Sequence, residues 1–432
     1  MFQQGLTRLR AAVAKASFQI VALRSANVLV NPLSQLLLIA KFGIASYGVY
    51  LAAQALASAL ERLVSFGVAD FAVREFINHP EQRSPTMQAL LLSRALAFII
   101  VTTVVSLIFV LFAFEGRYVL YFILFWCMAV FTIANKIFDS LSRALRHMDH
   151  LRIQSVGRLG IDIAALLAVV ILDVGYVGFI ITRLLGFGLL TAKQVFKYHR
   201  YLHGTWKQRT AIVDIARSRF QLSAFFGTNV ALRELGTQWL LVAYSFMVPS
   251  AMFGLVGLAW RLENVFAIGR NNVVHVITMP KLVAALNKPA ERFFDDYRLV
   301  TIMHLALGVA STVALLALLV LAEWFVLEDD ESFGIWFLLS MVVYGVVTTM
   351  SLIPGRLILA AGRLREFTAK LTLAVVAGYG ALLAVGLFHP FYALNVARIV
   401  YVVGSYAASW PIMQRLLKER FGRTASSVGG FK

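Results

Sequence analysis

The sequence contains little cysteine and little charge. A single cysteine, Cys127, stands among 432 residues, so an internal disulfide is excluded and no cysteine-based metal cluster is indicated. Charged residues make up only 14% of the chain and hydrophobic residues 60%, with a mean hydropathy of +0.78. A soluble core of this length could not bury so much apolar surface. The composition therefore predicts an integral membrane protein.

Motifs of common catalytic centres are also missing. The chain has no GxSxG elbow, no P-loop, no HExxH motif and no Cys/His metal spacing. The loops expected on the outer side are too short to build a catalytic domain. The sequence therefore predicts a protein that is not an enzyme, with no cofactor and no metal.

Apolar runs of roughly 20 residues recur along the whole chain, and each is long enough to cross about 30 Å of hydrocarbon as a helix. A basic hydrophilic segment at residues 199–219 separates six predicted spans from six others. The twelve spans lie at residues 18–40, 44–69, 88–113, 118–140, 153–173, 176–198, 220–247, 250–279, 299–322, 333–353, 368–388 and 391–414. The predicted fold class is thus all-α, with a six-helix lobe at 1–198, a cytoplasmic linker at 199–219, and a second lobe with a basic tail at 220–432.

Basic residues alternate between the loops on the two sides of the predicted membrane. Loops after even-numbered spans are rich in Lys and Arg, whereas Lys41 and Arg117 are almost the only basic residues on the other side, which carries an acidic run at 328–331. The positive-inside rule then places both termini in the cytoplasm. Loops facing anionic membrane lipids account for most of the net charge of +18, so nucleic acid is not an expected partner.

One short phrase occurs near the start of each half. "YGVYLAAQAL" at Tyr47–Leu56 and "FGLVGLAWRL" at Phe253–Leu262 both open the second span of their half. A six-span unit returns the chain to the cytoplasm, so two such units have the same orientation. The sequence therefore predicts a parallel repeat about a pseudo-twofold axis along the membrane normal.

Polar residues stand where hydrocarbon is expected, chiefly in the first two spans of each half. Intramembrane polar residues usually face a bundle interior or a hydrated cavity, and their helical spacing here puts each set on one face. The predicted cavity residues are Arg24, Asn27, Asn31, Arg62, Arg233, Arg261, Asn264 and Arg270. Since arginines outnumber nearby acids, the cavity suits an anion, and phosphate in particular because guanidinium forms forked hydrogen bonds.

Structural interpretations of these residues are open as well. Three arginines could pair with acids close in the chain, and two others could extend to the cytoplasmic surface. The pairs would be Arg62 with Glu61, Arg233 with Glu234, and Arg261 with Glu263, and the surface residues would be Arg158 and Arg270. Arg24 has no acid within a helical turn, which favours a functional role. Pro32 interrupts the first span, either as a hinge for transport or as a static kink.

Four acids are candidates for coupling transport to a counterflow of H⁺ or Na⁺. They are Glu61, Asp162, Glu234 and Glu263. Nothing in the sequence requires this coupling, because a membrane potential that is negative inside already favours outward movement of an anion. For two charges at 100 mV this contribution is on the order of 4–5 kcal/mol.

Two segments resemble a known family. "KFGIASYGVYLAAQALASALERLVSFGVADFAVREF" at Lys41–Phe76 resembles the second-helix signature of bacterial polysaccharide-export flippases, and Phe253–Leu282 resembles the matching segment of their second half, including its terminal proline, Pro280. The matching elements of the first segment are Tyr47, Gly48, Tyr50, Gly67, Arg74 and Glu75. That family belongs to the superfamily of multidrug and toxin extrusion (MATE) transporters and lipid-linked oligosaccharide exporters.

The resemblance implies a MATE-like fold of two six-helix lobes around a central cavity, working by alternating access. It implies a flippase in the bacterial inner membrane that moves an undecaprenyl-pyrophosphate-linked oligosaccharide, an O-antigen or exopolysaccharide repeat unit, from the cytoplasmic to the periplasmic leaflet. It also implies that Arg24, Arg62 and Arg261 hold the pyrophosphate. A polysaccharide polymerase and a chain-length regulator of lipopolysaccharide or polysaccharide biosynthesis would be partners.

Two other functions compete with this one. A MATE-type drug or metabolite antiporter would have the same fold, but an acidic or aromatic cavity would suit cationic drugs better than an arginine-rich one. A membrane-embedded oligosaccharide polymerase or ligase would need a substantial periplasmic loop with catalytic residues, and none is expected here.

Overall fold

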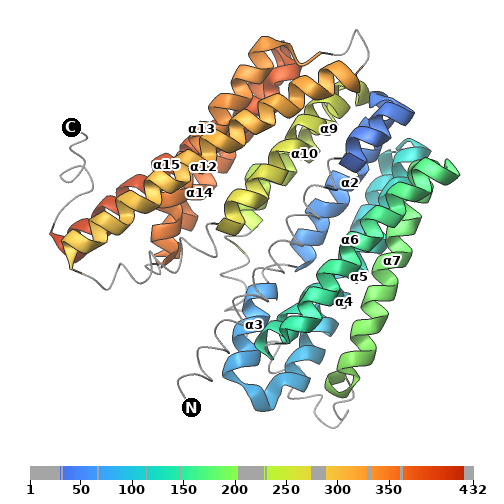
Figure 1. The fold of residues 1–432 in the computed structure, drawn as a ribbon, viewed down its shortest axis with the longest axis horizontal. Coiled ribbons are helices and arrows are strands. Elements are labelled where there is room, and N and C mark those ends of the chain that lie inside the picture. Colours follow the sequence, from blue (N-terminus) through green and yellow to red (C-terminus); the bar gives the residue numbers. More distant parts are fainter. Residues whose placement is uncertain are drawn as a thin grey trace, which may run out of the picture. The chain divides into compact units, whose positions relative to one another are not determined.

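The computed structural model describes residues 30, 33–65, 68–112, 114–145, 147–202, 228, 231–273, 289–327, 332–360 and 363–422 (Figure 1). All regular secondary structure within these ranges is helical. The predicted all-α class is therefore confirmed. Each of the twelve predicted spans coincides, wholly or in part, with a described helix.

Within the described residues, the first half contains one short apolar helix, six longer α-helices and one short 3₁₀ helix. After Leu33–Phe42 come α2 (Ile44–Ser65), α3 (Val68–Asn78), the short 3₁₀ helix η1 (Pro80–Gln82), α4 (Arg83–Phe112), α5 (Gly116–Ala144), α6 (Met148–Leu172) and α7 (Gly175–Leu202). The second predicted span, 44–69, thus coincides with α2 up to Ser65 and with the first residues of α3.

In the described part of the second half, a helical segment at 231–234 leads into a π-helical turn, which is uncommon. The elements from this turn onward are η3 (Leu235–Trp239), α9 (Leu240–Ser245), α10 (Ser250–Val273), α12 (Ala290–Phe325), α13 (Gly334–Ala360), α14 (Leu364–Phe388) and α15 (Pro390–Phe421). The bounds of α15 follow from local chemistry. Pro390 needs no amide partner in the first turn, and Gly422 adopts φ 64° and donates its N–H to the Lys418 carbonyl, which ends the helix.

Most of the long helices are apolar enough to cross a membrane. Among the described residues there are eight such helices: α4, α5, α6, α7, α12, α13, α14 and α15. The other four predicted spans, the first two of each half, are described only in part. The molecule is a multi-pass membrane protein.

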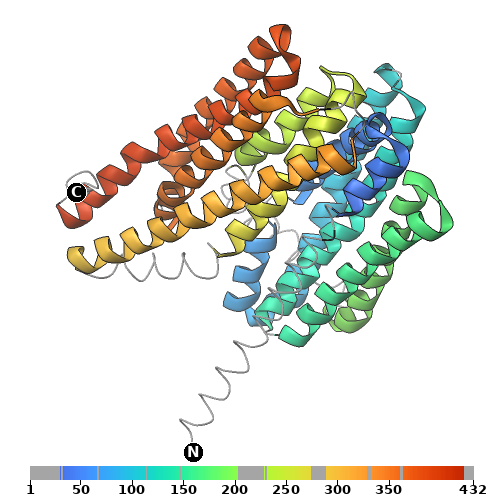
Figure 2. The same cartoon turned by 45° about the horizontal axis from the view of Figure 1, so that its top comes forward.

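Contacts divide the chain into two compact units. One comprises Met1–Phe42 and Val49–Ala231, and the other comprises Gly43–Gly48 and Leu232–Lys432. In the first unit, α4, α5 and α6 pack against α7, and α3 packs against α5. In the second, α13 and α14 pack against α15, and α12 packs against α10 and α13 (Figure 2). Of the predicted linker, only the residues up to Leu202 are described, and the lobe boundaries stay predictions.

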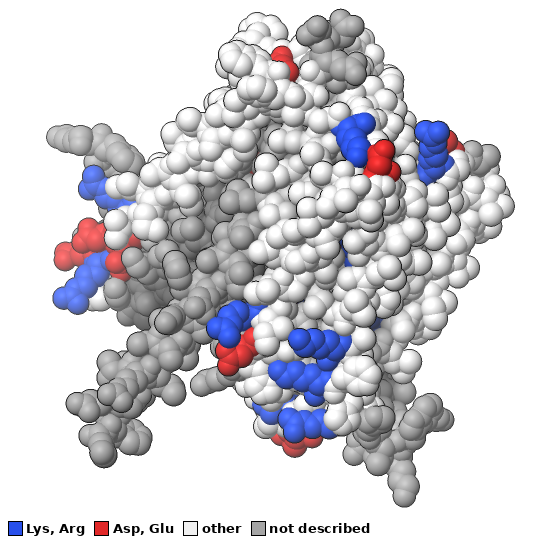
Figure 3. Space-filling view, turned by 45° about the vertical axis from the view of Figure 1, so that its right-hand side comes forward, with Lys and Arg blue, Asp and Glu red and all other residues white. Residues whose placement is uncertain are grey.

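Charged side chains occupy a small part of the described surface. Figure 3 shows lysine and arginine in separate patches, with a broad uncharged surface between them. Large apolar side chains point outward from the membrane-spanning helices, as Phe112 on α4 and Leu189 on α7 do at 71% and 74% exposure. This is the surface expected of helices that face lipid rather than water.

Candidate functional site

Several polar residues near the start of the chain are buried. Gln54 and Ser65 of α2 are each only 8% exposed, and the side chain of Glu61 is 13% exposed. Gln35, in the preceding short helix, is 1% exposed. Apolar residues of α2 such as Leu51 and Ala59 are buried too, so the polar face of this helix stays a prediction.

Several predicted cavity residues lie outside the described residues. They are Arg24, Asn27, Asn31 and the proposed hinge Pro32, together with the side chain of Arg270. The acidic outer run at 328–331 is also outside them. Their roles stay predictions.

The first unit balances its buried acids with basic side chains from neighbouring helices. Lys136 of α5 donates through Nζ to Glu61 Oε1 of α2 at 2.5 Å. Arg62, the residue considered as a partner of Glu61 in the sequence, is half-buried. The Glu61–Lys136 ion pair therefore joins two helices, α2 and α5.

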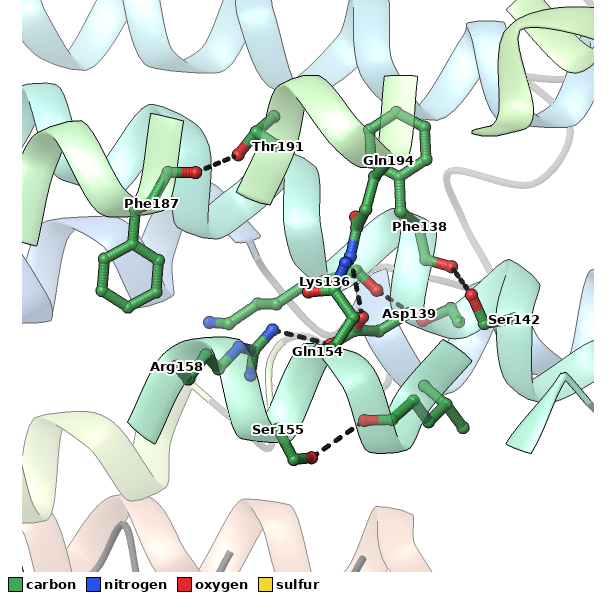
Figure 4. Close-up of polar contacts among 12 residues, drawn as sticks. Lys136, Phe138, Asp139, Ser142, Gln154, Ser155, Arg158, Phe187, Thr191 and Gln194 are labelled. Carbon is green, nitrogen blue, oxygen red and sulfur yellow. Dashed lines mark hydrogen bonds and ion pairs between the residues drawn. The ribbon is translucent and has the colours of Figure 1, made fainter. Parts of the chain in front are cut away.

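Asp139 of α5 is the centre of a second polar group. Its carboxylate is nearly buried and accepts hydrogen bonds from Arg158 Nη2 of α6 at 2.8 Å and Gln194 Nε2 of α7 at 3.2 Å (Figure 4). Arg158, for which extension to the cytoplasmic surface was one interpretation, is thus engaged inside the unit. The two hydrogen bonds connect three helices through one carboxylate.

Asp162 is paired across helices in the same way. Its Oδ1 lies 3.0 Å from Arg183 Nε of α7, and the two side chains are 16% and 11% exposed. Arg158, one helical turn earlier on α6, pairs with Asp139 instead. Sequence spacing identified Asp162 as an intramembrane acid but did not identify its partner.

The second unit contains a fully enclosed arginine that the sequence analysis missed. Arg398 of α15 is 3% exposed, and its Nη2 donates to the Thr237 carbonyl of the π-helix η3 at 3.1 Å. Its guanidinium lies 3.7 Å from the centre of the Trp260 ring, a close cation–π contact. Tyr344, Glu263 and Glu234 interact electrostatically with it.

The π-helix explains how this arginine is accommodated. A π-helical turn shifts the backbone hydrogen bonds of a helix, and such turns are frequent at functional sites. Here the hydroxyl of Tyr379 of α14 donates a hydrogen bond to the Leu235 carbonyl at 3.2 Å, and Arg398 donates one to the Thr237 carbonyl. Gly236 lies between them, and a Cβ atom at this position would approach the Tyr401 ring to 2.1 Å. The absence of a side chain at Gly236 therefore lets α15 pack against the turn.

A hydrogen-bond chain continues from Trp260. Its Nε1 donates to Asn395 Oδ1 at 3.0 Å, and Asn395 Nδ2 donates to Ser340 Oγ at 2.6 Å. Trp260 and Asn395 are both fully buried. Helices α10, α13 and α15 are thus connected by polar contacts next to Arg398.

The remaining predicted residues of the second unit lie close to these elements. Arg233 places its guanidinium 5.8 Å from the Phe367 ring centre, and Tyr401 interacts with it electrostatically. Glu263 is buried at 3% exposure, whereas Arg261 and Asn264 are half-buried. Glu234 directly precedes η3. Their shared role in lining a cavity stays a prediction.

Five charged residues with evident partners were not predicted: Arg94, Lys136, Asp139, Arg183 and Arg398. Each lies inside a predicted apolar span, in the third, fourth, sixth or twelfth. An ionisable residue at membrane depth is itself a signal of function or pairing. These positions could have been found by applying that criterion to every span instead of concentrating on the first two of each half.

Among the described residues, no group of three or more His, Cys, Asp or Glu side chains could hold a metal ion. In the described part of the first unit, Lys136 and Arg183 face carboxylates. In the second unit Arg233 and Arg398 contact aromatic rings, and Arg398 also donates to a backbone carbonyl.

Three solved structures share the fold over nearly the whole chain. An inward-facing multidrug resistance MATE family transporter of the MOP superfamily aligns with a TM-score of 0.66 and 12% identity, over 93% of this chain and 99% of that one. The lipid II flippase MurJ, in an inward closed conformation, aligns with a TM-score of 0.64 and 12% identity, over 93% of this chain and 87% of that one. The MATE multidrug transporter DinF-BH aligns with a TM-score of 0.62 and 13% identity, over 95% of this chain and 96% of that one.

These similarities define the fold as that of the MATE transporters and of a lipid flippase with the same architecture. The predicted fold class, an all-α membrane protein with a MATE-like fold, is confirmed. No family model matches the sequence, and no curated protein matches it.

Proposed function

We propose that this protein is a flippase for a polyprenyl-pyrophosphate-linked oligosaccharide. The substrate would be an undecaprenyl-linked O-antigen or exopolysaccharide repeat unit that moves from the cytoplasmic to the periplasmic leaflet of a bacterial inner membrane by alternating access. The fold supports a membrane transporter, since it occurs both in MATE transporters and in a lipid II flippase.

The surroundings of Arg233 are the observation that supports an anionic substrate. Its guanidinium lies over Phe367, and within the described ranges no carboxylate lies within ion-pair distance of it. A cation retained in this way has N–H donors that can turn to a phosphate. Together with Arg24, Arg62, Arg261 and Arg270, it gives the polar spans an excess of positive charge over Glu61, Glu234 and Glu263.

The physical task matches such a site. A pyrophosphate and several sugars cannot cross hydrocarbon unaided, while the polyprenyl tail can stay in it. A carrier for this lipid needs a polar, cationic interior and has no need of catalytic groups. The protein therefore acts as a transporter and not as an enzyme. Its partners would be membrane lipids, a polysaccharide polymerase and a chain-length regulator.

A MATE-type drug or metabolite antiporter is the second candidate, favoured by the structural similarity to multidrug transporters. Depletion of the protein in its native cell separates the two. A flippase predicts loss of surface glycan and accumulation of its lipid-linked precursor, with unchanged drug sensitivity. Increased sensitivity to cationic drugs with normal surface glycan would support the antiporter.

A further inference from the structure

Two of the four acids predicted as coupling sites contact basic side chains of the protein itself. The distances are 2.5 Å for Glu61 with Lys136 and 3.0 Å for Asp162 with Arg183. Both pairs lie in the first unit, which therefore has its own positive charges beside these acids.

Arg183 is held by more than its acid. Its guanidinium lies 5.6 Å from the Phe179 ring centre on the same helix. This additional contact holds the cation beside Asp162, so its position does not depend on ion pairing alone.

A buried carboxylate at membrane depth needs a positive charge nearby because desolvation of an isolated charge is costly. The charge can come from a cation taken up from solution or from a basic side chain. An ion from solution can be bound on one side and released on the other, which is what coupling requires. A lysine or arginine is tethered to its helix and cannot be released.

We propose that Lys136 and Arg183 are permanent counter-charges that occupy the place of a coupling cation beside Glu61 and Asp162. These acids then stabilise the helix packing of the first unit and do not exchange sodium ions during transport. The proposal concerns charge balance within the first unit, and it holds for any transported substrate.

Asp162 and Arg183 form the most direct test because both side chains are largely buried. The measurement is the thermal unfolding midpoint of the purified full-length protein in detergent, in sodium chloride and in choline chloride at equal ionic strength. The wild type is expected to have the same midpoint in both salts. Arg183→Gln is expected to unfold at a lower temperature and to regain part of the loss in sodium chloride only, because Asp162 then lacks its counter-charge.

Three variants serve as controls. Arg183→Lys retains the charge and is expected to remain insensitive to sodium. Combining Asp162→Asn with Arg183→Gln removes the acid as well, so the sodium response should disappear and the midpoint should recover. Arg363→Gln removes a cation from an exposed group with Glu366 and Glu419, where water already stabilises the acids, and is expected to create no sodium response.

Two results would overturn the proposal. One is a saturable, sodium-specific stabilisation of the wild type that Asp162→Asn abolishes. The other is an Arg183→Gln protein as stable as the wild type in choline chloride. If Arg183→Gln yields no folded protein, recovery of folding in the double variant supports the proposal. A sodium-specific response in the titration of the wild type would still contradict it.

Discussion

Gly48 and Gly254 lie against each other where the beginnings of α2 and α10 meet. A Cβ atom added to Gly48 would lie 1.8 Å from the Ser250 carbonyl oxygen, and one added to Gly254 would lie 2.4 Å from the Ile44 carbonyl oxygen and 3.2 Å from the Gly48 nitrogen. Each glycine is the second residue of one of the two similar phrases in the sequence. The recurrence thus corresponds to a contact in which two backbones touch, and both glycines belong to the second unit.

Gly48→Ala should therefore lower stability and transport together. The added methyl group has no space beside Ser250, so the helices must separate, at a cost of about 1–3 kcal/mol by comparison with overpacked cores. The thermal unfolding midpoint and the amount of folded protein in the membrane measure the effect. Gly160→Ala is the matched control, because a Cβ atom there meets nothing within 4 Å. Equal behaviour of the two variants would refute the close-contact argument.

Asp139→Asn should destabilise the first unit. The change preserves the size of the side chain but removes the charge that accepts from Arg158 and Gln194, so a loss of about 2 kcal/mol is expected. Asp149→Asn provides the comparison, since Asp149 is 88% exposed and pairs with Arg152 at the surface. Unfolding midpoints should fall for the first variant and barely change for the second. A fall of equal size in both would contradict the assignment of Asp139 as a structural centre.

His147 should make stability depend on pH. It lies between α5 and α6, and burial together with Lys197 and Arg200 lowers its pKa from the usual value. Because the folded protein binds this proton less readily than the unfolded chain, the contribution is fully present above about pH 6.5 and is lost as pH falls further. His147→Gln keeps a polar partner for Tyr198 Oη, which lies 3.3 Å from His147 Nδ1, and should reduce the fall of the midpoint between about pH 7.5 and 5.5. An unchanged fall would assign the pH dependence to other groups.

The sequence was sufficient for the helices but only partly for the site. Apolar runs of membrane-spanning length identify α4 or α12 without knowledge of their neighbours, because lipid is the partner of most of their surface. The sequence does not determine in the same way which residues of neighbouring helices pair with one another. Asp162 could reach residues one turn away on α6, yet it pairs with Arg183 of α7, since the rotation of each helix about its axis decides which groups meet. Arg398 depends in addition on a π-helical turn that no simple periodicity predicts.

Arg24 provides a test of anion binding outside the described residues. If it holds a pyrophosphate, Arg24→Ala should abolish surface glycan and cause the lipid-linked precursor to accumulate, with normal protein level and topology. Lysine should rescue partly because it restores the charge without the forked hydrogen bonds, and glutamine should fail because it has no charge. Full glycan export by Arg24→Gln at normal expression would instead mean that Arg24 is structural.

The most direct test of the central claim is translocation in proteoliposomes that contain only this protein and a labelled polyprenyl-pyrophosphate oligosaccharide. The fraction of labelled lipid accessible to an impermeant pyrophosphatase is followed over time, with protein-free vesicles as the baseline. We predict that the wild type exposes the lipid of the inner leaflet much faster than the baseline, that Arg233→Gln slows this, and that Arg233→Lys retains part of it. A wild-type rate equal to that of protein-free vesicles, in vesicles that do transport a cationic dye, would contradict the flippase function.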